Sequence, residues 1–146
     1  MSNNYFKKSE LYSFITGVAS TAIARRLQKK FNTAGLSLTI EQWSVLYHLW
    51  KEDGISQQDL CQATFRDKPS MTRLVDNLEK SGLVKRGPSK TDRRKNLITL
   101  TEKAKAIEAQ CHHFASETVD EALSGVSNDN IEVCRKVLKQ VYDNLT

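Results

Sequence analysis

Residues 66–101 constrain the fold of this chain more than any other stretch. Apolar side chains first recur there at helical spacing, and Gly82 ends that pattern. Two short apolar runs follow, at residues 83–86 and 96–100, and they flank a basic loop. Runs of this length on either side of a turn predict a β-hairpin. The stretch therefore predicts an amphipathic helix with a β-hairpin wing beside it.

A second, shorter helix is expected directly before the first. Ser56 is a suitable N-cap for it, and its pattern ends near Thr64. Asp67 can cap the longer helix, and Pro69 is tolerated in the first turn because the first N–H groups there have no helical acceptor. Two helices joined by residues 65–68 predict a helix–turn–helix.

The remaining segments predict four further helices. Thr39 and Gln42 have the spacing of a capping box. The expected helices cover residues 9–32, 39–54, 101–122 and 127–145, and residues 1–8 are expected to form a loose arm. The fold class is therefore mainly α with a small β-hairpin wing, in one domain covering residues 1–146. Its winged helix–turn–helix part is placed at about residues 36–101, between helices at about residues 9–34 and 102–146.

The positive charge of the chain is concentrated in the predicted hairpin. The whole chain has a net charge of +5, and residues 85–95 alone carry six cations and a single acid, Asp92. The rest of the chain is therefore close to neutral. A local basic patch beside a helix–turn–helix is the electrostatic pattern of a nucleic-acid-binding protein.

The helix and the hairpin are expected to contact different parts of a DNA duplex. The early residues of an α-helix can reach base edges in the major groove, where Arg73 can form a fork to a guanine. The loop is narrow enough for the minor groove, where Arg94 would sense groove width, with Asp92 holding an arginine in place. The alternatives are a solvated turn for the basic loop and a surface contact to Asp76 or Asn77 for Arg73. The predicted DNA-contacting residues are Ser56, Lys68, Ser70, Thr72, Arg73, Asn77, Arg86, Lys90, Asp92, Arg93, Arg94 and Lys95.

The chain resembles the MarR family of winged-helix transcription regulators. The resemblance is carried by residues 72–79 (TRLVDNLE), 82–86 (GLVKR), 92–94 (DRR) and 100–101 (LT), and it extends to one long helix before the winged helix and two after it. It implies a homodimer on a palindromic operator, with repression relieved by a signal. It also implies dimerisation through the flanking helices, which agrees with the apolar stripe of residues 127–145, since that stripe has no partner nearby in the sequence.

The sequence leaves the nature of the signal open. In relatives, small aromatic acids often bind between the dimer region and the winged helix, and the candidate residues here are Phe14, Trp43, Tyr47 and His48, for which core packing is the alternative interpretation. A zinc site at residues 111–113 would need further ligands, because adjacent helical residues point about 100° apart. No metal or cofactor is therefore expected.

The three cysteines, Cys61, Cys111 and Cys134, bear on redox sensing and on location. Redox-sensing relatives carry a reactive cysteine in the first helix, and this chain has none before Cys61. The odd number and wide spacing suit a reducing cytoplasm. No signal peptide or membrane span is expected.

Common catalytic motifs are absent from the sequence. It holds no Gly-rich phosphate loop, no HExxH and no GxSxG, so an enzyme is not expected. The alternatives to a sequence-specific regulator are a redox- or zinc-responsive regulator of the same fold and a DNA-binding or interaction module without sequence preference.

Overall fold

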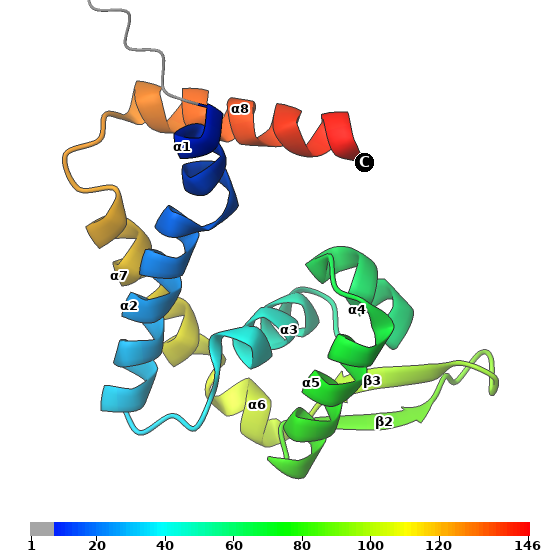
Figure 1. Cartoon of the computed structure of the whole chain (residues 1–146). Coiled ribbons are helices and arrows are strands. Elements are labelled where there is room, and N and C mark those ends of the chain that lie inside the picture. The colour runs from blue at the N-terminus through cyan, green and yellow to red at the C-terminus, as the bar shows by residue number, and fades with distance from the viewer. Residues whose placement is uncertain (1–7) are drawn as a thin grey trace, which may run out of the picture.

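The structure is a computed structural model that describes residues 8–146, with side chains from Glu10 onward. The arm predicted for residues 1–8 falls outside the described residues up to residue 7, and Lys8 already begins α1. In chain order the elements are α1 Lys8–Ser13, η1 Phe14–Val18, α2 Ala19–Thr33, α3 Ile40–Lys51, β1 Ile55–Ser56, α4 Gln57–Thr64, α5 Lys68–Lys80, β2 Val84–Pro88, β3 Asn96–Leu100, α6 Glu102–Ala106, α7 Glu108–Ala122 and α8 Asn128–Leu145 (Figure 1).

The predicted fold class is confirmed, with one strand more than expected. The wing pairs β2 with β3 in antiparallel register from Val84 opposite Leu100 to Pro88 opposite Asn96. β1 joins the other edge of β3, with Ile55 opposite Ile98. A strand of two residues is too short to show the alternation that predicts strands, which is why the sequence did not indicate β1.

Side-chain caps fix where most of the helices begin. Thr39 and Gln42 form the predicted capping box, in which Gln42 N donates to Thr39 Oγ1 at 3.1 Å and Thr39 N donates to Gln42 Oε1 at 3.0 Å. Asp67 caps α5 by accepting from Ser70 N at 2.7 Å. Thr101 and Ser127 cap α6 and α8 as predicted.

Two predicted helices are interrupted. The helix expected at residues 9–32 contains the π-helical turn η1, which includes Gly17. Glycine weakens a helix, and Thr16 Oγ1 donates to Tyr12 O at 2.7 Å, a side-chain bond that competes with regular helical pairing. The helix expected at residues 101–122 divides at Ile107, where α6 ends and α7 begins.

The hydrophobic core joins the winged helix to the inner ends of α2 and α7. Phe31 of α2, Leu49 of α3 and Cys111 of α7 are completely buried in one cluster with the inward faces of α4, α5 and the sheet. The antiparallel pair of α2 and α7 extends away from this cluster, and α8 runs across its far end (Figure 1). Within the described part of the chain, α8 has no buried residue.

Candidate nucleic-acid interface

The recognition helix α5 exposes one face beside the wing. A tight turn precedes α5. Phe65 is the first residue of this turn and has a left-handed backbone with φ of 56°. The exposed face lines a shallow groove of about 530 Å³. The groove is lined by Lys68, Pro69, Thr72, Arg73, Asp76, Asn77 and Lys80. A convex helix with this polar, mainly basic surface has the form that enters a major groove.

Arg73 and Asn77 lie on this exposed face, as predicted. No carboxylate within the described chain forms an ion pair with Arg73, because Asp76 pairs instead with Arg86. The charge of Arg73 nonetheless contributes to lowering the pKa of Asp67, after the larger effect of hydrogen bonds from Ser70. Ser70 is half-buried and borders the exposed face.

Ser56 and Thr72 both use their hydroxyls inside the protein. Ser56 Oγ accepts from Asp59 N at 3.1 Å as the cap of α4. Thr72 Oγ1 accepts from Gln57 Nε2 at 2.7 Å and donates to Lys68 O at 2.9 Å. Ser56 thus caps α4 and Thr72 joins α4 to α5, and the contact of both hydroxyls with DNA stays a prediction.

Arg86 is also committed to an internal contact. Its guanidinium lies against α5, with Nη2 at 2.7 Å from Asp76 Oδ1 and Nη1 at 3.4 Å from Glu79 Oε1. The side chain is only 25% exposed. The sequence did not indicate these ion pairs, because spacing along the strand gives no information on the carboxylates of a neighbouring helix, and a contact of Arg86 with DNA stays a prediction.

Two side chains brace the wing loop at residues 89–95. Ser89 Oγ accepts from Thr91 N at 3.2 Å, a contact that sequence reasoning missed although serine is common in such turns. Asp92 Oδ1 accepts from Arg94 N at 3.0 Å. Asp92 was expected to hold an arginine and fix the loop, and it does so through the backbone N–H of Arg94.

The bracing leaves the cations of the loop turned to solvent. They are exposed, and none has a carboxylate partner among the described residues. These cations are Lys90, Arg93, Arg94 and Lys95. A loop tip with four unpaired cations is suited to a polyanionic groove.

The side chains suggested for a signal molecule do not form one site. Trp43 and Tyr47 pack on each other with ring centroids 5.6 Å apart, and His48 stands edge-on to Tyr47 at 5.5 Å. Burial, and then the charge of Lys51, lowers the pKa of His48. Phe14 lies on η1, outside this cluster. His112, which the sequence singled out only as a zinc ligand, joins the cluster from α7 at 6.0 Å from Tyr47.

The cysteines and the neighbouring histidines have separate surroundings. Burial raises the pKa of Cys111 to about 11, Cys61 is half-buried, and Cys134 is exposed on α8. His112 faces Glu108 at 3.5 Å and His113 faces Glu117 at 3.3 Å. No cluster of His, Cys, Asp and Glu suited to a metal ion occurs within residues 8–146.

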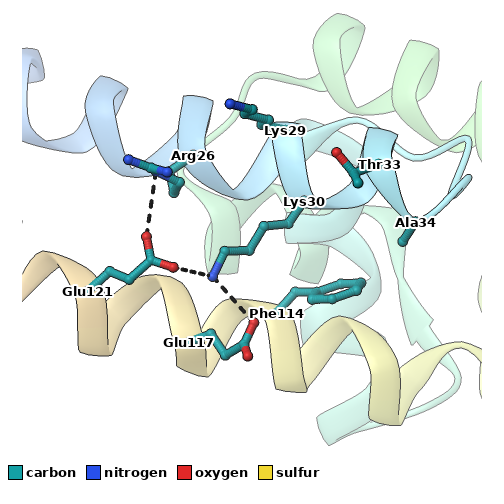
Figure 2. A pocket seen from close by; sticks show the side chains of 8 residues that line it. All are labelled: Arg26, Lys29, Lys30, Thr33, Ala34, Phe114, Glu117 and Glu121. Atoms are coloured by element: carbon teal, nitrogen blue, oxygen red, sulfur yellow. Dashed lines mark hydrogen bonds and ion pairs between the residues drawn. The ribbon is translucent and has the colours of Figure 1, made fainter.

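A separate pocket of about 380 Å³ lies between α2 and α7. Figure 2 shows Lys30 directed from α2 between two carboxylates of α7, above the ring of Phe114. Lys30 Nζ is 2.7 Å from Glu121 Oε1 and 3.3 Å from Glu117 Oε2. These ion pairs cross from one helix to the other and join α2 to α7.

Comparisons with known proteins agree with this architecture. The model of a family described as the MarR family matches residues 34–95. The transcriptional regulator PA3341 has 31% sequence identity and a TM-score of 0.79, covering 95% of this chain and 98% of its own. No helix of the described chain is long and apolar enough to cross a membrane.

Two more distant structures share the fold. A MarR variant from E. coli complexed with operator DNA has a TM-score of 0.82 at 24% identity, covering 94% of this chain and 98% of its own. CouR from Rhodococcus jostii, bound to p-coumaroyl-CoA, has a TM-score of 0.78 at 22% identity, covering 93% of this chain and 92% of its own.

Proposed function

Because the chain belongs to the MarR family of transcription regulators, we propose that it is a sequence-specific repressor that acts in the cytoplasm. It binds double-stranded DNA as a homodimer on a palindromic operator. A small molecule releases it from that operator. The three parts of this proposal, DNA, dimer and signal, depend on different regions of the molecule.

One observation carries the DNA-binding part, and it is the set of unpaired cations gathered on α5 and the wing loop. Within the described chain, no cation exposed on α5 or on the wing loop forms an ion pair. All three cations of α8, Arg135, Lys136 and Lys139, do form ion pairs, whereas α2 and α6 carry both paired and unpaired cations. The phosphates of a polyanionic partner supply the missing negative charges, and the cations of the protein replace the counterions condensed on that partner.

The proposed division of contacts follows from the shape of the two elements. The exposed face of α5 fits the major groove, where Arg73 and Asn77 meet base edges. The loop beyond β2 and β3 extends past α5 (Figure 1) and carries Arg94 towards the minor groove. The MarR variant that is complexed with operator DNA has the same fold, which supports the proposal that this fold binds an operator.

The dimer and the signal are proposed on separate grounds. The apolar side chains of α1, η1 and α8 are exposed, and burying them requires a second copy. A two-fold dimer presents two recognition helices to a palindrome. The proposal of a small-molecule signal is supported by the related CouR, which is bound to p-coumaroyl-CoA, and the aromatic cluster around Tyr47 between α3 and α7 is the proposed contact.

Selection of bound duplexes from random DNA tests the proposal. The full chain is expected to enrich a palindromic motif and to prefer it over unrelated duplex by at least ~10³-fold. Arg94→Ala is expected to weaken binding and to reduce the salt dependence by about one phosphate contact per wing. Arg135→Ala, which removes a paired cation on α8, is the control and is expected to leave both unchanged.

The same experiment separates the alternative function. Equal affinity for every duplex would indicate a DNA-binding module without sequence preference. Absence of binding to any duplex would overturn the proposal. Arg73→Ala is expected to relax the base preference at one position of each half-site, and an unchanged motif would remove Arg73 from base contact.

A further inference from the structure

The recognition helix carries two carboxylates next to its proposed DNA-facing surface. Asp76 lines the same groove as Arg73 and Asn77, and Glu79 lies one turn further along the helix. Their side chains are 47% and 45% exposed. Acids so close to phosphates would repel them, since juxtaposed like charges strongly disfavour association. The structure shows how this repulsion is removed.

A single arginine from the wing covers both carboxylates. Besides the guanidinium contacts to Asp76 and Glu79, Arg86 Nη2 donates to Thr72 O at 3.4 Å, and Arg86 N donates to Glu79 Oε2 at 3.1 Å. Residues 72, 76 and 79 lie along one stripe of α5, and the guanidinium lies over that stripe. The fork geometry of arginine allows one cation to serve several oxygens.

The contact continues into α4. Thr72, whose carbonyl accepts from Arg86, also accepts from Gln57 through its hydroxyl at 2.7 Å. Gln57 is the first residue of α4. The chain of contacts from Gln57 through Thr72 to Arg86 therefore connects the two helices of the helix–turn–helix with the first strand of the wing.

We propose that Arg86 is a charge-masking and positioning residue of the DNA-binding surface, and that it makes no contact with DNA. It neutralises Asp76 and Glu79, which would otherwise oppose the phosphates, and it fixes β2 against α5. This inference rests on the proposed function, because masking matters only if α5 approaches a polyanion. It assigns Asp76 and Glu79 a purpose as well, since they hold the guanidinium that ties the wing.

A mutant cycle on affinity for a duplex selected from random DNA tests the inference. Arg86→Gln exposes both carboxylates and is expected to weaken binding by about tenfold or more. Adding D76N and E79Q to Arg86→Gln is expected to restore affinity to within about threefold of the unmodified chain. The neutral amides no longer repel phosphate, and the amides at positions 76, 79 and 86 can still hydrogen-bond with one another. With Arg86 present, D76N and E79Q together are expected to change affinity by less than about threefold.

Lys85→Gln provides the matched control. Lys85 neighbours Arg86, is exposed, and has no carboxylate partner in the described chain. Its replacement removes one charge without exposing an acid, so D76N and E79Q are expected to give no rescue in that background. Thermal unfolding checks that every variant folds, and Arg86→Met, which also removes the charge, replaces Arg86→Gln in the cycle if that variant does not.

Several outcomes would overturn the inference. Failure of D76N and E79Q to rescue Arg86→Gln would indicate direct contact between Arg86 and DNA. Equal gains from D76N and E79Q with and without Arg86 would show that the carboxylates are not masked. An Arg86→Gln variant with unchanged affinity would leave Arg86 without a role. If the unmodified chain binds no duplex, the proposed function fails and the inference falls with it.

Discussion

The inner and outer regions of the molecule differ in the burial of their apolar side chains. The inner region, residues 27–118, holds every buried hydrophobic side chain among residues 10–146. The outer region, residues 10–23 and 119–146, holds every exposed large hydrophobic side chain of the described residues except Phe65. Both regions have helices with apolar stripes, so the difference lies in what those stripes contact.

The contrast shows which part of the molecule is structurally complete. The winged helix and the adjoining ends of α2 and α7 form a closed core, which is what an independent folding unit requires. The outer helices carry the same type of stripe, and no surface of the described residues covers it. An exposed apolar surface of this extent is typical of a protein interface. The inner region is therefore suited to DNA contact and the outer region to pairing of two copies.

Disrupting the stripe of α8 is expected to have the largest effect. Introducing Asp at both Val137 and Leu138 places two charges in the proposed dimer interface, so sedimentation is expected to show a 16.6 kDa monomer. Affinity for a palindromic duplex is expected to fall by ~10² or more, because the two recognition helices lose their linkage.

The control for this change places the same two charges on the polar side of α8. Gln140→Asp together with Asn144→Asp is expected to leave the mass and the affinity unchanged, since both side chains are exposed and bond only to each other. A variant with Asp at Val137 and Leu138 that remained dimeric would place the interface elsewhere.

Truncation of one leucine in each region sharpens the comparison. Leu49→Ala is expected to lower the free energy of unfolding by about 2–5 kcal/mol at any protein concentration, because Leu49 is completely buried and its loss leaves a cavity. Leu138→Ala is expected to matter only at concentrations where the dimer forms. Urea unfolding at two protein concentrations measures both, and a concentration-independent loss for Leu138→Ala would contradict the assignment.

Phe65, the exception in the comparison, supports a prediction of its own. Its left-handed backbone is unfavourable for a residue with a Cβ, and its ring is 76% exposed. Phe65→Gly is therefore expected to raise the free energy of unfolding by about 1 kcal/mol. Ala63→Gly on the exposed face of α4 is the control and is expected to lower it by about the same amount. Urea denaturation measures the free energy of unfolding of both variants. Destabilisation by Phe65→Gly would show that the contact between the rings of Phe65 and Tyr142, whose centroids are 6.2 Å apart, matters more than the backbone strain.

Caps that lie within one segment were predicted correctly, whereas the interruptions of two helices and the contacts between segments were not. The caps at Thr39, Asp67 and Ser127 follow from three-residue spacing, and the structure confirms them. The pairing of Arg86 with Asp76 and the addition of β1 to β3 depend on how distant segments pack. Periodicity has no information on such contacts.

The candidate site shows the same limit. The unpaired cations of the wing follow from composition alone, because one acid cannot neutralise six cations. Composition does not predict which of these cations face solvent. Arg86 forms an ion pair with α5, whereas Arg94 is exposed. Thr72 was assigned to DNA from its place in the first turns of α5, and its actual partner, Gln57, lies 15 residues away in the sequence.

The smallest expected effect concerns the ion pairs that join α2 to α7 outside the core. The hydrogen bond from Lys30 holds the pKa of Glu121 below its ordinary value of about 4.5, with further contributions from the charges of Lys30 and Arg26. A depressed carboxyl pKa stabilises the fold above the ordinary value, and this stabilisation is lost as the pH falls through the folded-state pKa. Glu121→Gln is therefore expected to lower the thermal midpoint slightly near neutral pH, by an amount that vanishes in acid. Glu102→Gln removes a carboxylate whose partner, Lys105, lies in the same helix, so it should not loosen α2 from α7. A deficit for Glu121→Gln that was the same at every pH would mean that packing against Phe114, and not the ion pair, joins the two helices.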